Sequence, residues 1–123
     1  MSPYIWAIRG ATTVDADTET QVTARVQELV TEVLERNGLA FEDLVSVIFT
    51  ATDDIHSMFP AAAARAMGLT DVPLMCAREL EVDGALPMCI RMMAHVVTER
   101  ERSELRHVYL KGAQVLRDDL AHD

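Results

Sequence analysis

The sequence has little of several features that mark particular classes of protein. Its 123 residues include two cysteines and 5% aromatic side chains, and Lys111 is the one lysine beside ten arginines. No uninterrupted apolar run approaches the roughly 18 residues of a membrane span, and the N-terminus lacks the basic-then-apolar pattern of a signal peptide. We therefore expect a cytoplasmic protein in which Cys76 and Cys89 are thiols rather than a disulfide.

Positive charge is also scarce. Eleven Lys and Arg residues against 20 Asp and Glu residues give a net charge of −9 at pH 7. Because this balance repels polyphosphates, we expect neither nucleic acid nor an anionic membrane as a partner. The glycine-rich fingerprints of dinucleotide and nucleoside triphosphate sites do not occur in the sequence, and we expect no cofactor.

The overall composition is that of an ordinary globular domain. Half of the residues are apolar and 25% are charged, so we expect a single domain over 1–123 with a polar tail from about 118. The most strongly patterned segment is 18–37, where a capping-box sequence from Thr18 to Gln21 precedes apolar residues at helical spacing. Gly38 suits the end of this long helix.

The other segments alternate between strand and short-helix patterns. Continuous apolarity over 44–52 favours a strand that is buried on both faces. Pro60 and Gly68 bracket a short helix over 61–67. The remaining predictions are strands over 4–14, 72–82 (interrupted), 88–97 and 106–110, turns at 41–44 and 99–104, and extended chain over 113–117. This order predicts an α+β fold with a mixed sheet, one long and one short helix, and the helices mostly on one face.

Arg91 is the first candidate functional residue, because it lies within an almost wholly apolar strand. Strand alternation puts it on one face with Cys89 and His95. If both faces of the strand are covered, an unpaired guanidinium there costs several kcal/mol, so it needs a partner. Two interpretations remain open: an internal ion pair with Glu79 or Glu81, or a ligand anion.

Three more polar residues occur in otherwise apolar strands. Arg9 repeats the pattern of Arg91 beside the flexible Gly10, although an edge strand would also let it reach water. Glu79 and Tyr109 complete the group. Two arginines, a carboxylate and a phenol within apolar strands predict a pocket for a small, oxygen-rich anion.

Other kinds of site have weaker support. Asp53, Asp54 and His56 are not accompanied by a second cluster of His or Cys at zinc spacing, so we expect no metal. Cys76 is not surrounded by a nucleophile motif, and a small buried thiol is its simpler interpretation.

Six short motifs follow one another from about residue 5 to 120. They are Ile8-Arg-Gly-Ala-Thr-Thr-Val14, Phe59-Pro-Ala with Arg65, Cys76-x-x-Glu79, Cys89-Ile-Arg-Met92, Arg106-His-Val-Tyr-Leu110 and Leu116-Arg117. In order and spacing they resemble the monofunctional chorismate mutases of the AroH class. The resemblance implies a homotrimer of five-stranded mixed sheets that forms a pseudo-α/β barrel, with active sites at subunit interfaces. It also implies the Claisen rearrangement of chorismate to prephenate, a step of the shikimate pathway in aromatic amino acid biosynthesis.

The same resemblance implies roles for individual residues, with Arg91, Glu79 and Arg9 as the catalytic ones. Arg91 would contact the ether oxygen whose bond breaks and a substrate carboxylate, while Arg9 and Tyr109 would bind carboxylate or ether-side oxygens. Glu79 and Cys76 would hold the ring hydroxyl. The other residues implied are Phe59, Ala61, Arg65 and Leu74 from the neighbouring subunit, and Leu116 and Arg117 closing the site from the C-terminal segment.

The sequence departs from the family pattern in places. Ala62 stands where the family often has a lysine, so one carboxylate contact is missing or is supplied by Arg65. Met75 occupies a position beside the pocket that can be polar in relatives. Cys76 and Glu79 are three residues apart and would face opposite ways in a regular strand, so joint contact with one hydroxyl requires a bulge or turn between them.

Two rival functions stay open. An imine deaminase-like trimer would also use an arginine for a carboxylate, but it needs a water-activating arrangement that the sequence does not reveal. A noncatalytic trimer that binds a carboxylate metabolite is the second rival.

Overall fold

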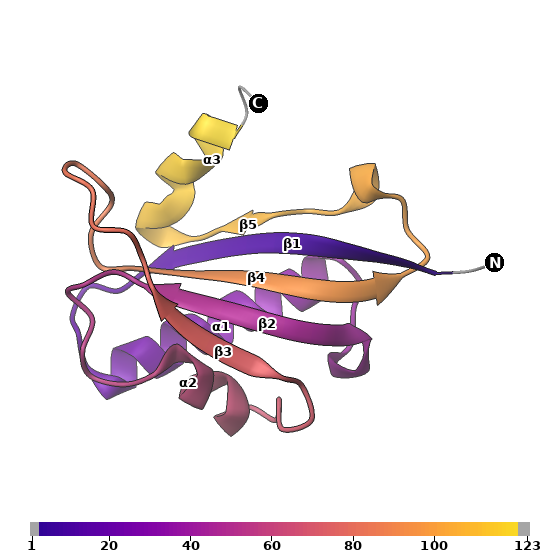
Figure 1. Ribbon diagram of the computed structural model, residues 1–123, viewed down its shortest axis with the longest axis horizontal. Coiled ribbons are helices and arrows are strands. Elements are labelled where there is room, and N and C mark those ends of the chain that lie inside the picture. The colour runs from indigo at the N-terminus through magenta and orange to yellow at the C-terminus, as the bar shows by residue number, and fades with distance from the viewer. Residues whose placement is uncertain (1–2, 121–123) are drawn as a thin grey trace.

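The computed structural model describes residues 3–120 and contains one five-stranded sheet flanked by helices (Figure 1). The strands are β1 (Tyr4–Thr13), β2 (Leu44–Ala51), β3 (Leu74–Arg78), β4 (Cys89–Thr98) and β5 (Val108–Tyr109). Their order in the sheet is β3-β2-β4-β1-β5. The central strand β4 pairs antiparallel with β1 and β2, whereas β1–β5 and β2–β3 are parallel pairs. The predicted α+β fold with a mixed sheet is confirmed.

The long helix α1 (Glu19–Arg36) forms where the sequence predicts it. Thr18 caps its N-terminus, because the Thr18 side chain accepts a hydrogen bond from the backbone N–H of Gln21. The other half of the predicted capping box does not form, since the Gln21 side chain accepts from two backbone N–H groups of the preceding turn instead. Gly38 follows the helix with φ of 63°, a left-handed conformation that suits glycine. The buried stripe comprises Val22, Val26, Leu29, Val30, Val33 and Leu34.

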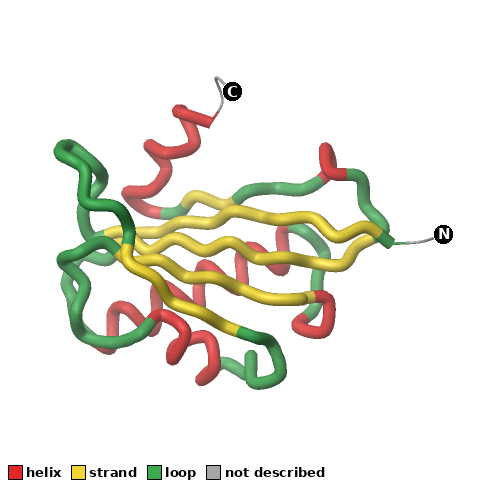
Figure 2. The backbone as a smooth tube through the Cα atoms, viewed as in Figure 1, coloured by secondary structure: helices red, strands yellow, loops and turns green. Residues whose placement is uncertain are grey.

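The short helix α2 (Pro60–Ala66) lies with α1 against the same face of the sheet. Figure 2 shows the strands as one continuous layer in front of these two helices. The main core fills the space between the layers, and its largest fully buried side chains include Phe49, Ile8 and Leu29. The prediction that the helices lie mostly on one face is confirmed.

The other side of the sheet, here called the open face, is left without a helix over most of its area in the described part of the chain. It is made by Ile5, Ala7, Arg9 and Ala11 of β1, Ser46, Ile48 and Thr50 of β2, Met75 and Ala77 of β3, and Arg91, Met93 and His95 of β4. The prediction that 44–52 is buried on both faces is therefore wrong for the single chain. Val47 and Phe49 are buried on the helical side, but Ile48 and Thr50 are only half-buried.

The C-terminal segment differs most from the prediction. Instead of extended chain over 113–117 and a polar tail from 118, a turn at Lys111–Ala113 leads into a third helix, α3 (Gln114–Leu120). Lys111 adopts φ of 53°, which turns the chain out of the β5 direction. Residues 121–123 of the expected tail lie outside the described residues.

Packing explains why this segment becomes helical. Ala113 and Leu116 are three residues apart, so in a helical turn both can lie on one side. They pack in a small cluster with Ala11, Cys89 and Tyr109. An extended chain would have pointed them in opposite directions.

Other boundaries differ by a few residues. The strands β3 and β5 are shorter than the predicted 72–82 and 106–110, and short 3-10 turns at Phe41–Asp43 and Arg102–Glu104 occupy the two predicted turns. Within residues 3–120, no helix combines the length and apolarity needed to cross a membrane.

Candidate active site

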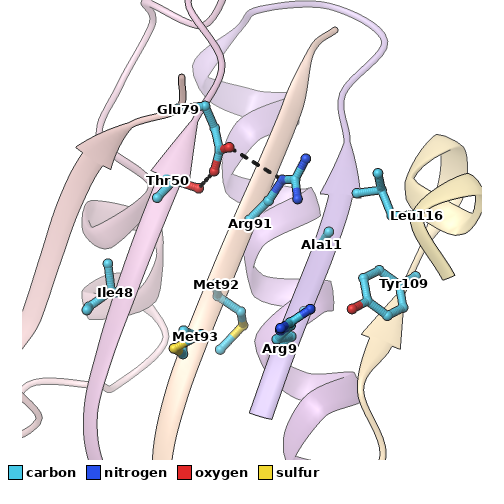
Figure 3. Close-up of a pocket in the computed structure, with 11 residues that line it drawn as sticks. Arg9, Ala11, Ile48, Thr50, Glu79, Arg91, Met92, Met93, Tyr109 and Leu116 are labelled. Carbon is cyan, nitrogen blue, oxygen red and sulfur yellow. Dashed lines mark hydrogen bonds and ion pairs between the residues drawn. The ribbon is translucent and has the colours of Figure 1, made fainter. Parts of the chain in front are cut away.

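A cavity of about 440 Å³ lies on the open face, over β1, β2 and β4 (Figure 3). Four residues that the sequence singles out line it together: Arg9, Glu79, Arg91 and Tyr109. Leu116 of α3 lines it as well. The cavity therefore brings two cations, a carboxylate and a phenol into one apolar hollow, as predicted from their positions in apolar strands.

Arg91 reaches this cavity because of its place in β4. Its neighbours Ile90 and Met92 point into the core, so alternation directs Arg91 to the open face. Arg91 Nε lies 3.6 Å from Glu79 Oε1, and the Arg91 side chain keeps 43% of its surface exposed. The ion pair considered from the sequence thus exists with Glu79 but leaves much of the guanidinium open to the cavity.

Two polar atoms at the cavity lack hydrogen-bond partners among the described residues. They are Arg91 Nε, which is too far from the Glu79 carboxylate for a hydrogen bond, and Tyr109 Oη. Both atoms are buried, and a buried polar group without a partner costs free energy. Ligand oxygens in the cavity would remove this cost.

Glu79 is held at the end of β3 by contacts with β2. Its backbone N–H donates to the carbonyl oxygen of Ala51 at 3.0 Å. Its side chain accepts a hydrogen bond from the Thr50 hydroxyl. Because Glu79 follows Ala77 by two residues, it lies on the open face, whereas Cys76 lies on the helical side.

Arg9 and Tyr109 enter the cavity from the adjacent parallel strands β1 and β5. Tyr109 pairs with Ala11, two residues along β1 from Arg9. Figure 3 shows the Tyr109 hydroxyl turned toward Arg9. Among the side chains that the structure describes, those of residues 3–117, none forms an ion pair with Arg9, so its charge faces the cavity without a described counter-ion.

The position of Arg9 is also fixed through His107. The backbone N–H of Arg9 donates to His107 Nδ1 at 3.0 Å, which extends the two-residue pairing of β1 with β5. Partial burial, together with the positive charge of Arg9, lowers the pKa of His107 from its ordinary value of 6.5. The neutral imidazole that this hydrogen bond requires is therefore favoured near neutral pH.

The C-terminal helix closes one end of the cavity. Leu116 and Ala113 cover Cys89, which lies on β4 two residues before Arg91. Burial raises the pKa of the Cys89 thiol and outweighs the opposing effect of Arg91. Cys89 is thus a neutral, packed thiol, in agreement with the prediction that both cysteines are thiols.

The loop that carries Asp53 and Asp54 has a structural role. Asp54 accepts the backbone N–H of Met88 and the Thr52 hydroxyl, which fixes the start of β4. Burial raises the pKa of Asp54, but these hydrogen bonds outweigh it and leave the pKa lower than usual. Asp53 pairs with Arg78. Among the side chains of residues 3–117, no group of three metal-ligating residues is found.

A second hollow of about 700 Å³ lies on the other side of β3, beside α2. Phe59 and Cys76 line it, as does Ala62, the position where the sequence departs from the family pattern. Pairing of β3 with β2 is regular from Leu74 to Arg78, without the bulge that joint contact of Cys76 and Glu79 would require. Within one chain these two residues therefore serve different hollows.

The remaining predicted residues lie around these hollows. Ala61 is buried in the core beside Phe59, and Leu74 packs against the core from the start of β3. Arg65 is exposed in the last turn of α2. Arg117 is exposed on α3 and lines a separate hollow behind Tyr109. None of these four lines the cavity around Arg91.

Sequence reasoning did not single out Thr50, which lines the cavity and binds Glu79. The sequence does contain a signal for it: Ser46 and Thr50 are polar residues of an otherwise apolar strand and lie on the same face of that strand. Because both faces of this strand were expected to be buried, Thr50 was not considered as a site residue.

Comparison with known proteins identifies the family. A sequence profile described as "Chorismate mutase type I" matches residues 5–120. The chain is 42% identical to chorismate mutase AroH of Bacillus subtilis over 118 residues, covering 95% of this chain and 93% of that one. It is 47% identical to chorismate mutase AroH of Thermus thermophilus over 114 residues, covering 92% and 93%.

The fold comparison agrees. A solved structure of chorismate mutase from Clostridium thermocellum superimposes with a TM-score of 0.88 at 50% identity, covering 89% of this chain and 98% of that one. Fold, cavity residues and sequence similarity thus lead to one conclusion: this chain belongs to the type I chorismate mutase family.

Proposed function

We propose that this chain, an enzyme of the chorismate mutase class, converts chorismate to prephenate by holding the substrate in a reactive conformation and stabilising charge on it. The single observation that carries this mechanism is the cavity around Arg91. It presents two guanidinium groups and a phenol, and two of its buried donor atoms lack partners among the described residues. A compact dianion with an ether oxygen offers the acceptors that these donors need.

The reaction moves electrons within one molecule. The ether C–O bond breaks while a C–C bond forms, and no proton, nucleophile or metal takes part. Negative charge grows on the ether oxygen as its bond stretches, and we assign Arg91 to that oxygen and to a carboxylate. A cation fixed in advance stabilises this charge without reorganisation in the transition state.

Binding also selects the reactive shape. Arg9 and Tyr109 would hold carboxylate or ether-side oxygens, and Glu79 would accept a hydrogen bond from the ring hydroxyl. The residues that make these contacts come from β1, β4 and β5 and from the end of β3, so the substrate would be bound from several sides. Restricting it to a near-attack geometry supplies much of the acceleration in reactions of this kind.

We further propose that the active unit is a homotrimer forming a pseudo-α/β barrel, with sites between subunits. The open face carries exposed apolar side chains, with Ile5 64% and Met75 61% exposed, which favours a second copy of the chain as its cover. Phe59, Cys76 and Arg65 lie away from the Arg91 cavity of their own chain. A head-to-tail arrangement would let these residues, with Ala61 and Leu74, form the far wall of a neighbour's cavity.

The direct test is to follow the absorbance of chorismate with purified enzyme. We expect the absorbance to fall and prephenate to accumulate, at a turnover number nearly constant from about pH 6 to 9 because no proton moves. A steep rise in turnover with thiol ionisation would contradict the mechanism and favour Cys76 as a nucleophile. Binding of chorismate without conversion, or deamination of an imine substrate, would favour one of the two rival functions.

A further inference from the structure

Thr50 lies between the two charged residues whose pairing defines the cavity. In the register of the sheet it is opposite Arg91 of β4 on one side and opposite Ala77 of β3 on the other. Glu79 follows Ala77 by two residues and therefore reaches the same face. The Thr50 hydroxyl donates a hydrogen bond to Glu79 Oε2, as the dashed line in Figure 3 shows.

The two oxygens of Glu79 have different partners as a result. Oε2 binds Thr50, whereas Oε1 lies 3.6 Å from Arg91 Nε. Among the described side chains of residues 3–117, Thr50 is the one hydrogen-bond donor to this carboxylate. The Glu79 carboxylate therefore faces the Arg91 guanidinium through Oε1, at a distance too long for a hydrogen bond.

A carboxylate without such a restraint has a more favourable alternative. Guanidinium and carboxylate groups form bidentate pairs with two short parallel hydrogen bonds. A bidentate pair between Glu79 and Arg91 would occupy two guanidinium N–H groups. Those N–H groups would then no longer be available to donate to a substrate oxygen.

We propose that Thr50 is a positioning residue whose hydroxyl keeps Glu79 from closing onto Arg91. This inference rests on the proposed function, because it takes Arg91 as the group that stabilises the reacting ether oxygen. Thr50 acts through Glu79 and need not touch the substrate.

The first test compares substitutions at one position. Thr50→Val keeps the shape of the side chain and its preference for a strand but removes the hydroxyl, whereas Thr50→Ser keeps the hydroxyl. We expect Thr50→Val to lower turnover at saturating chorismate by about tenfold or more, as for loss of a hydrogen bond to a charged group. Thr50→Ser should stay within about twofold of wild type. Thr98→Val, the same change at the far end of β4, is the matched control and should not alter turnover.

The second test removes the residue through which Thr50 acts. In a Glu79→Ala background, Thr50→Val should change turnover by less than about twofold, since coupled residues are not additive. An equally slow Thr50→Ser enzyme would overturn the inference. So would a Thr50→Val effect that persists at full size without Glu79, because Thr50 would then act on the substrate or elsewhere.

Crystal structures provide a test that does not depend on activity. In Thr50→Val, both Glu79 oxygens should lie within hydrogen-bond distance of Arg91, whereas in wild type at most one should. Unchanged carboxylate geometry in Thr50→Val would refute the inference even if turnover fell. A wild-type enzyme that leaves chorismate unchanged would instead refute the proposed function, so the two failures are distinguishable.

Discussion

The two faces of β4 have different roles: side chains on one face pack in the core, and side chains on the other face belong to the candidate site. Ile90 and Met92 pack in the main core and are 0% and 4% exposed, although Met92 also borders the cavity, while Arg91 between them projects into the cavity on the open face. The helical face is continuous with the main core, whereas the open face carries polar groups that lack partners within the described residues. Neighbouring positions in one strand should therefore affect different properties: turnover on one face and stability on the other.

The largest expected effect is on the open face. Arg91→Ala should lower turnover by roughly 10²–10³ or more, since removing one aligned donor from a preorganised site has that effect and this donor is charged. The free energy of unfolding, measured by urea denaturation, should change little because the Arg91 side chain is 43% exposed. A near-normal turnover number in folded Arg91→Ala at saturating chorismate would remove Arg91 from the mechanism.

The adjacent position should behave in the opposite way. Ile90→Ala removes a fully buried side chain and should lower the free energy of unfolding by about 2–5 kcal/mol. Turnover per folded molecule should remain close to that of wild type, because Ile90 does not line the cavity. Loss of turnover in Ile90→Ala at a temperature where the protein is fully folded would show that the two faces of β4 are not independent.

A third experiment extends the comparison to the proposed subunit interface. Arg65→Glu and Arg91→Ala chains, each weak alone, should complement one another when unfolded together and refolded. With random mixing, about one site in four draws both intact residues from opposite partners. No recovery in verified mixed trimers would mean that both residues serve one subunit's site or that Arg65 acts only at the entrance. Normal turnover of Arg65→Glu alone would distinguish these two cases.

The smallest expected effect concerns the edge of the sheet at His107. Its pKa is lowered in the folded chain by burial and by Arg9, so the unfolded state binds this proton more readily. The stabilisation is complete above the unfolded value of about 6.5 and is lost as the pH falls through the folded pKa. His107→Asn keeps an acceptor for the Arg9 N–H but does not titrate. Urea denaturation should therefore show a shallower loss of stability below pH 6.5 in this variant.

Identical pH dependence in wild type and His107→Asn would mean that the hydrogen bond between Arg9 and His107 does not form in solution. Because turnover involves no proton transfer, the pH dependence of stability is the more direct measure of this contact.

Local patterns in the sequence were sufficient to predict much of the fold. The helix over 18–37 was correct because its apolar stripe, N-terminal Thr18 and following Gly38 all indicate the same structure. The segment 113–117 was predicted incorrectly because its conformation depends on packing against Cys89, which is distant in sequence. Local propensity could not reveal that contact.

The site was predictable where a charged side chain stands out in an apolar strand. Arg9, Arg91, Glu79 and Tyr109 were found in this way, and the structure brings them to one cavity. Thr50 was missed because threonine is common in strands, and its role depends on the hydrogen bond to Glu79, which the sequence does not show. The separation of Cys76 from Glu79 followed from strand alternation, but which hollow each one lines required the structure.

The arrangement of β1 has a consequence for how the protein is made. Both strands that pair with β1 come from the C-terminal third of the chain: β4 over Cys89–Thr98 and β5 over Val108–Tyr109. During synthesis the first strand therefore emerges from the ribosome long before either partner exists, and such long-range pairing is slow to form. Since Arg9 lies on that strand, the cavity cannot assemble in a truncated or half-folded chain. Turnover should consequently return during refolding only after β1 has paired with β4 and β5.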